Sequence, residues 1–340
     1  MKPFAPVALS LLLAACSSSP TPEPTTPPPA STTPSTASAA PATSTTPAAD
    51  ASAANTVDIE AAIKAGDGAR ARQLAEQLIV KNPHNPRAHY YAGVGAELAG
   101  DKAGAEKHYR DALAQTATFS EAAGNLAVLL INDKRAGEAV TLLRPIAAKS
   151  PDDPLVQINY ATALAESGDA AGAAPIYERL AQKNQLPPEI RLDYAGVLIK
   201  AGKKDDAARV LRDGLAAIKD DRDQTAAYGR VLAQTGAFDD AIKALDRAIQ
   251  IKSGADLLTY RALFKRSTKN LDGARVDLEA AIKENPNFAP AHRYLGEVLE
   301  DMKKPADAKK EYEKAVAADP DGAHGKKARE RLDALKGAKK

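Results

Sequence analysis

The sequence has one cysteine, no tryptophan and few aromatic residues, and each shortage narrows the possible classes of protein. A lone cysteine, Cys16, rules out an internal disulfide framework and any metal site built from several cysteines. Aromatic residues form only 4% of the chain, which favours cores made of alanine and leucine. The near balance of 46 basic and 44 acidic residues leaves no overall charge bias toward nucleic acid.

Motifs of catalysis and of cofactor or metal binding are also lacking. The histidines show no His-Glu-x-x-His pattern or other ligand spacing, and His89 and His292, at equivalent places, are interpreted as packing residues. Residues 66–71 superficially resemble a dinucleotide-binding turn, but no strand precedes them, so a turn between two helices explains them better. The sequence therefore predicts no catalytic residue, no cofactor, no metal and no small-molecule substrate.

A regular spacing of alanines runs through most of the chain. The steps are of 34 residues, apart from one step of 33 between Ala241 and Ala274. An apolar residue stands four places after each alanine, and a small residue stands twelve places before it in seven of the eight cases. The alanines are Ala71, Ala105, Ala139, Ala173, Ala207, Ala241, Ala274 and Ala308.

This spacing predicts pairs of closely packed helices. Two helices approach each other closely only where the side chains at their contact are small. In the last pair we expect Gly296 on the first helix to face Ala308 on the second, with Tyr312 filling the remaining groove. Pro320 then ends the second helix, because proline has no backbone N–H to donate.

Residues 289–320 resemble one tetratricopeptide repeat in their L-G-x-x-L, A-x-x-x-Y-x-x-A and final proline positions. A period of 34 residues is typical of the same family. The resemblance implies an all-α fold, a right-handed α-solenoid of about eight helix-turn-helix repeats over residues 55–322. Residues 323–340 are then expected to form a basic capping helix and tail. In the seventh repeat, the one-residue deletion predicts either a shortened turn or a shifted first helix.

The N-terminal residues 1–15 resemble the signal peptide of a bacterial lipoprotein. Lys2 supplies a positive start, and the apolar run that follows is too short to span a bilayer. The run ends in L-A-A-C at residues 13–16, which resembles a lipobox. The resemblance implies cleavage before Cys16, acyl chains such as palmitate on this cysteine and, because Ser17 follows, an outer-membrane location facing the periplasm. The alternative is an ordinary secretory signal with a chance cysteine.

Residues 16–54 consist almost entirely of serine, threonine, proline and alanine. A segment of this composition cannot bury enough apolar surface to offset the loss of chain entropy on folding. The sequence therefore predicts a disordered tether between the lipidated Cys16 and the repeats.

In tetratricopeptide proteins, the first helices of the repeats line a concave groove that holds proteins or peptides. The family's contact places, transferred to repeats two to four, give a largely apolar partner-binding groove: Tyr90, Val94, Glu97, Leu98, Val128, Ile131, Asn132, Leu155 and Ile158. Repeats five to eight carry mainly charged residues there: Lys200, Arg230, Arg266, Arg293, Glu297, Glu300 and Asp301. The open alternative is that some of these side chains pack within the array.

The resemblance implies a non-catalytic scaffold that binds a protein or peptide partner and touches the membrane through its N-terminal lipid only. Envelope assembly is the expected setting, whether of pili and secretins, of the outer membrane or of exported polysaccharide. A second hypothesis is a cell-wall adaptor that recruits a peptidoglycan enzyme, with the basic tail on an anionic polymer. An enzyme is a remote third hypothesis.

Overall fold

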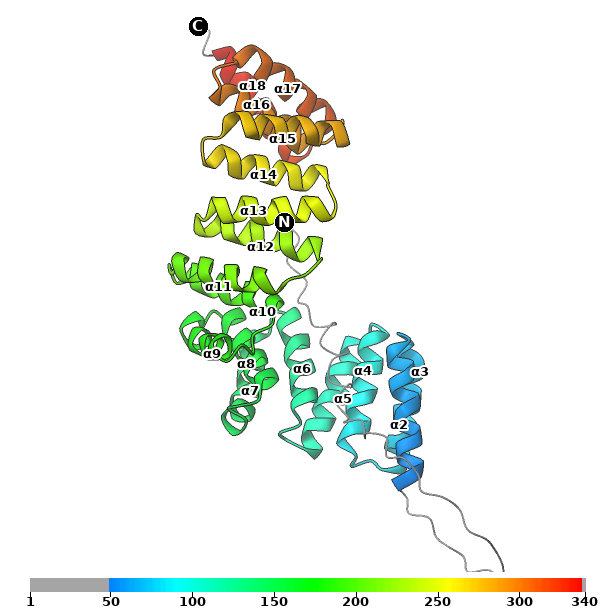
Figure 1. Ribbon diagram of the computed structural model, residues 1–340. Coiled ribbons are helices and arrows are strands. Elements are labelled where there is room, and N and C mark those ends of the chain that lie inside the picture. Colours follow the sequence, from blue (N-terminus) through cyan, green and yellow to red (C-terminus); the bar gives the residue numbers. More distant parts are fainter. Residues whose placement is uncertain (1–48, 338–340) are drawn as a thin grey trace, which may run out of the picture. The chain divides into compact units, whose positions relative to one another are not determined.

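The computed structural model describes residues 49–337, and the predicted signal peptide, Cys16 and most of the predicted tether lie outside the described residues. Every regular element in the described part is a helix, and the helices divide between two compact units that meet in sequence at Ser167 and Gly168. Within each unit, successive helices pack side by side (Figure 1). The prediction of an all-α fold built from packed helix-turn-helix pairs is confirmed.

The first unit contains three complete helix pairs and one further first helix. Its helices are α2 (Ala49–Lys64), α3 (Gly68–Lys81), α4 (Pro86–Leu98), α5 (Lys102–Gln115), α6 (Ser120–Asn132), α7 (Ala136–Lys149) and α8 (Pro154–Glu166). Helix α2 begins before residue 55, the expected start of the array, so the last part of the predicted tether is helical. The alanines at this end are good helix formers and extend the first turn of α2.

The second unit continues with the same alternation and ends in one extra helix. Its helices are α9 (Ala170–Gln182), α10 (Pro188–Lys200), α11 (Lys204–Ala217), α12 (Arg222–Thr235), α13 (Phe238–Ile251), α14 (Ala255–Ser267), α15 (Leu271–Glu284), α16 (Ala289–Asp301), α17 (Pro305–Ala318) and α18 (Ala323–Gly337). Residues 252–254 join α13 to α14, one residue fewer than the connection 285–288 of the next repeat. Of the two irregularities expected in the seventh repeat, the structure shows the shortened turn.

The core of both units follows the alanine spacing read from the sequence. All eight alanines have no exposed surface, and so do most of the larger residues four places further on, including Tyr109, Tyr177 and Tyr312. A Cβ atom added to Gly296 would lie 2.5 Å from the Tyr312 ring, and one added to Gly93 would lie 2.5 Å from the Tyr109 ring. The glycines therefore make room for the tyrosine ring of the facing helix. Gly296 was expected to face Ala308, but the atoms nearest to it belong to the Tyr312 ring.

The turns inside the repeats share one backbone conformation. Gly100 has a φ of 80°, and the Asp101 side chain accepts a hydrogen bond from the backbone N–H of Gly104 at 2.9 Å, which caps α5. The same glycine and capping aspartate occur at the start of α3 and of α9. Each of these three turns thus reverses the chain between two helices, and its aspartate satisfies a free N–H at the start of the second helix.

Helix α18 covers the apolar end of the second unit. Ala328 is fully buried in a cluster that includes Leu295 and Tyr312, and Leu332 and Leu335 pack against that cluster. The predicted capping helix is therefore present in the fold. Among the residues that the structure describes, no helix has the length and apolar character needed to cross a membrane.

Candidate partner-binding surface

The first helices of the first unit carry the residues that the sequence assigned to partner binding. Helix α4 is capped by Asn85, whose side chain accepts from the backbone N–H groups of Arg87 and Ala88 at 3.0 and 3.3 Å. Asp153 caps α8 in the same way, and a proline follows each cap at the first helical position. These caps fix where α4 and α8 begin.

The predicted groove residues are not equally accessible. Two of them belong to the core, because Val94 is 2% and Ile158 is 5% exposed. Asn132 is exposed, and the other six are half-buried: Tyr90, Glu97, Leu98, Val128, Ile131 and Leu155. We call these seven accessible residues the first-helix surface. It spans α4, α6 and α8, and α6 packs directly against α8.

Tyr90 lies in a cluster of aromatic rings that joins the second repeat to the third. Its ring centroid is 5.5 Å from that of Phe119, which precedes α6, and 6.2 Å from that of Tyr109 on α5. The guanidinium of Arg87 sits over the Phe119 ring at 5.9 Å. Aromatic pairs at these separations add to the energy of burial. Tyr90 therefore supports the contact between repeats and offers only part of its ring to a partner.

Glu97 accepts a hydrogen bond from the buried Tyr109. The hydroxyl of Tyr109 donates to Glu97 Oε2 at 2.7 Å and accepts from Asn125 Nδ2 at 3.2 Å. Burial, with the Glu97 charge second, raises the pKa of Tyr109 far above its usual value, so its hydroxyl remains a donor at every ordinary pH. Glu97 thus has an internal function whether or not it meets a partner.

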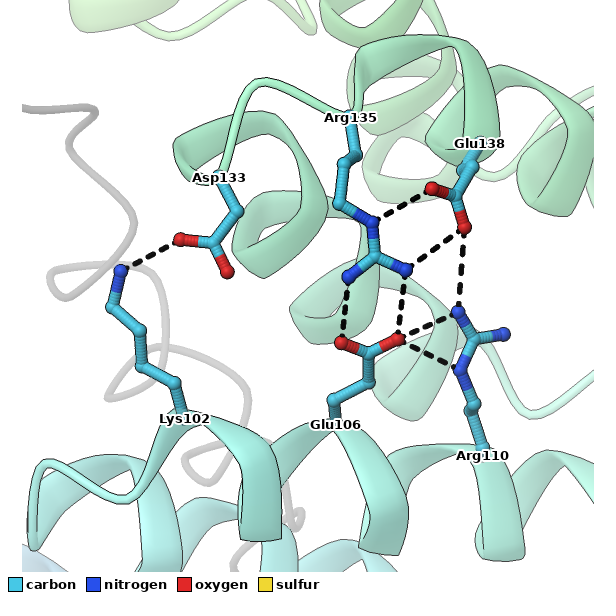
Figure 2. A network of polar contacts seen from close by, with 6 residues as sticks. All are labelled: Lys102, Glu106, Arg110, Asp133, Arg135 and Glu138. Carbon is cyan, nitrogen blue, oxygen red and sulfur yellow. Dashed lines mark hydrogen bonds and ion pairs between the residues drawn. The ribbon is translucent and has the colours of Figure 1, made fainter.

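An ionic network joins α5, the second helix of repeat two, to the start of α7. Figure 2 shows Glu106 between two guanidinium groups, with Arg135 Nη1 at 2.8 Å and Arg110 Nη2 at 2.7 Å from its carboxylate. Arg135 also donates to Glu138 from Nε at 2.7 Å. Arg135 and then Arg110 lower the pKa of Glu106 to about 2. Lys102 and Asp133 form a separate pair at 2.7 Å in the same region.

Four of the seven charged residues that the second unit carries at the corresponding places pair with one another. Arg266 Nε donates to Asp301 at 2.6 Å, and its Nη1 pairs with Glu297. Arg293 Nη1 reaches the other oxygen of Glu297 at 2.5 Å. This pairing leaves the half-buried apolar residues of the first unit as the more suitable candidate for a partner site.

Sequence reasoning missed the network of Figure 2. Glu106 and Arg110 have the i,i+4 spacing of a helical ion pair, and Arg135 and Glu138 have the i,i+3 spacing. Those two local pairs were readable from the sequence. The bond between Arg135 and Glu106 spans 29 residues, and only the 34-residue period could have placed these two side chains together.

The described helix pairs, their small-residue contacts and their capped turns define a tetratricopeptide-type array. Models of the family described as tetratricopeptide repeat match the chain at residues 56–220, 195–256 and 266–332. The chain is therefore a tetratricopeptide-repeat protein.

The chain is similar to one curated protein and to several solved structures. Cellulose synthase operon protein C of Xanthomonas axonopodis pv. citri (strain 306) is 34% identical over 197 residues, which are 55% of this chain and 13% of that protein. The crystal structure of a tetratricopeptide repeat protein from Parabacteroides merdae ATCC 43184 has a TM-score of 0.51 and 15% identity, covering 74% of this chain and 99% of that one. The crystal structure of yeast Tom70 has a TM-score of 0.45 and 15% identity, covering 80% and 59%. The likeness to the Parabacteroides merdae structure, at 15% identity, shows the fold alone.

Proposed function

We propose that this protein is a non-catalytic scaffold that binds an extended or helical segment of a protein partner on the first-helix surface. The observation that carries the proposal is the row of half-buried apolar side chains on three first helices of one unit, Leu98, Val128, Ile131 and Leu155 among them. Their partly exposed side chains can bury further apolar area against a partner, which is the main source of binding energy. Asn132, exposed at the end of α6, adds a hydrogen-bonding group.

Polysaccharide export is the branch of envelope assembly that we favour for this scaffold. The support is the similarity to a protein named for a cellulose synthase operon, over a stretch that is 13% of that protein. Pilus or secretin assembly and outer-membrane biogenesis are the other settings that the same surface would fit.

Crosslinking from single positions tests the proposed surface. A photoreactive residue at Val128 or Ile131 would lie on α6, half-buried and facing the partner. Val276 on α15 is the matched control, since it is an apolar residue 55% exposed in the other unit. We expect one protein to be captured from Val128 and Ile131 and not from Val276. Equal capture from all three positions, or none from any, would reject the surface.

We further propose that lipid on Cys16 attaches the scaffold to the periplasmic face of the outer membrane, with the following segment acting as a tether. The support is the L-A-A-C sequence at residues 13–16 and the serine after it. Two or more acyl chains give stable anchoring, whereas one chain gives only marginal binding. The variant Cys16→Ser should incorporate no labelled palmitate and should leave the outer-membrane fraction, with an unchanged circular dichroism spectrum. Retention in that fraction would show that lipid is not the anchor.

A cell-wall adaptor is the alternative function, and the charge of α18 favours it. Lys326, Lys327 and Arg329 are exposed on this helix. A salt series separates the two functions, because electrostatic binding to an anionic polymer weakens with ionic strength and apolar binding does not. Loss of the partner between low and 0.5 M salt would favour the adaptor.

A further inference from the structure

Two buried histidines and one aspartate converge between the helices of repeat two. His89 lies on α4, and His108 and Asp111 lie one turn apart on α5. His89 and His108 are 9% and 8% exposed, and one ligand atom from each of the three residues lies within 4.8 Å of the other two. Nδ1 of His89 and Nδ1 of His108 are both buried without a hydrogen-bond partner. A buried polar atom without a partner carries a cost in free energy and needs an explanation.

The hydrogen bond on the far side of His89 places one of its ring hydrogens. Nε2 of His89 lies 2.8 Å from the carbonyl oxygen of Pro83, which can only accept, so Nε2 carries the hydrogen. In the neutral form of the ring Nδ1 then carries the lone pair, and this atom lies 3.9 Å from Asp111 Oδ2. An imidazole that donates to a backbone carbonyl from one nitrogen and offers a lone pair from the other has the arrangement of a metal ligand.

Repeat eight contains the same histidine in a completed hydrogen-bond arrangement. His292 Nε2 lies 2.9 Å from the carbonyl oxygen of Pro286, and its Nδ1 lies 2.7 Å from Glu311. Lys314 in turn pairs with Glu311 at 2.7 Å. Counting along the two repeats, Glu311 corresponds to His108 and Lys314 to Asp111. Repeat two thus has a second imidazole and a carboxylate where repeat eight has a carboxylate and an ammonium.

We propose that His89, His108 and Asp111 form a site for a divalent transition metal of the Zn²⁺ type, which joins α4 to α5. Two imidazoles and one carboxylate are ligands that Zn²⁺ accepts, and a fourth position would remain for water. Ligand atoms of a tetrahedral Zn²⁺ stand about 3.4 Å apart for bonds of about 2.1 Å. The ligand atoms of the three residues lie within 4.8 Å of one another, so the longer separations have to contract when the metal binds.

One ion pair at the site would compete with the proposed metal. Lys107 lies 3.7 Å from Asp111 Oδ2 and would have to yield that carboxylate to the ion.

Cobalt and zinc titrations of the untagged full chain test the site. We expect one equivalent of Co²⁺ to give a visible absorption spectrum that Zn²⁺ abolishes, and Zn²⁺ to raise the unfolding temperature. Asp111→Asn, which keeps the shape of the side chain, should weaken Zn²⁺ binding at least tenfold. Absence of any stoichiometric binding to the wild-type chain would overturn the proposal.

The repeat-eight arrangement provides matched controls. The double variant H108E/D111K copies the residues of repeat eight into repeat two, so it should fold, gain a His89–Glu pair and bind no Co²⁺. The reverse variant, E311H/K314D, should fold and bind a second equivalent. If H108E/D111K binds Co²⁺ like the wild type, the metal sits elsewhere; if a folded E311H/K314D gains no second site, these three positions do not suffice.

Discussion

At the scale of single residues, repeats two and eight share an arrangement of three side chains that the other repeats lack. A glycine on the first helix makes room for a tyrosine ring on the second, and a glutamate four residues after the glycine accepts from the tyrosine hydroxyl. In repeat two these residues are Gly93, Glu97 and Tyr109, and the hydrogen bond is 2.7 Å long. In repeat eight they are Gly296, Glu300 and Tyr312, with the same bond length. The tyrosine thus fills the core while its polar end reaches a carboxylate at the helix edge.

Removing the hydroxyl of Tyr109 should lower the free energy of unfolding more than removing the hydroxyl of Tyr312. Tyr109→Phe deprives Glu97 of its hydrogen-bond donor, and a half-buried carboxylate left without its donor costs about 2 kcal/mol. Tyr312→Phe leaves Glu300 with the guanidinium of Arg331, whose Nε lies 3.2 Å away, so we expect a cost of about 1 kcal/mol. Urea unfolding of both variants measures the difference. If Tyr312→Phe lowers the free energy of unfolding more than Tyr109→Phe does, the loss of the hydrogen bond to Glu97 is not the larger effect.

Residue-scale prediction from the sequence succeeds for the core and only partly for the site. The alanine spacing identifies buried positions, because two helices pack closely only where a small residue stands. The residue type alone therefore marks the contact. The nine groove residues were chosen by their place in the repeat, which does not record exposure. Val94 and Ile158 are buried because a first helix also contacts its neighbouring helices, so part of its apolar stripe serves the array.

At the scale of elements, the turn between the two helices of each repeat has one residue with positive φ. In five repeats it is glycine, but in the others it is a lysine: Lys134, Lys269 and Lys303, with φ of 65°, 67° and 61°. A left-handed conformation costs a residue with a Cβ atom about 1 to 2 kcal/mol. Local propensity gives no sign of these three lysines, and only their place in the 34-residue period reveals them.

Lys303→Gly should therefore stabilise the second unit. Relief of the left-handed conformation outweighs the extra entropy of glycine in the unfolded chain, and we expect a net gain of about 0.5 kcal/mol. Lys309→Gly is the control, since Lys309 is exposed inside α17 and glycine there should cost about 1 kcal/mol. Thermal unfolding of the two variants provides the comparison. If both variants shift the unfolding temperature in the same direction, the left-handed conformation of Lys303 is not the cause of the change.

The ionic network between α5 and α7 predicts a dependence of stability on pH. Glu106 has a folded pKa of about 2, below the value of about 4.3 expected in the unfolded chain. Its contribution is fully present above the unfolded pKa and is lost as the pH falls toward 2. Glu106→Gln should cost about 1 kcal/mol at pH 7, a figure reduced for solvent screening, and nearly nothing at pH 2.

Urea midpoints of the wild type and Glu106→Gln at several pH values measure this prediction. Glu313→Gln is a suitable control, because Glu313 forms one exposed pair with Lys309 at 3.7 Å and should show little dependence. A constant difference between wild type and Glu106→Gln across the acid range would mean that the charge of Glu106 does not stabilise the fold.

At the scale of the whole molecule, the chain behaves as a series of neighbouring contacts. In a repeat array each repeat packs only against those next to it, so stability is close to a sum of local terms. The terminal repeat needs a cover for its apolar face, and α18 provides it in the second unit. Its existence was predictable from the helical spacing of Ala328, Leu332 and Leu335. The hydrogen bond from Arg331 to Glu300 was not predictable, because the two residues are 31 positions apart and neither local sequence indicates the contact.

Deletion of residues 323–340 should separate the stability of the array's end from the function proposed for its beginning. The deletion uncovers the cluster around Leu295 and Tyr312 and removes the burial of Leu332 and Leu335, at a cost of about 3 kcal/mol to the second unit. The contacts of α4, α6 and α8 are untouched, so crosslinking from Val128 should capture the same partner with the same efficiency. Lys336→Ala, an exposed change on α18, should alter neither property. If the deletion abolishes capture from Val128 while circular dichroism shows the first unit still folded, the partner depends on α18, and the first-helix surface alone does not account for binding.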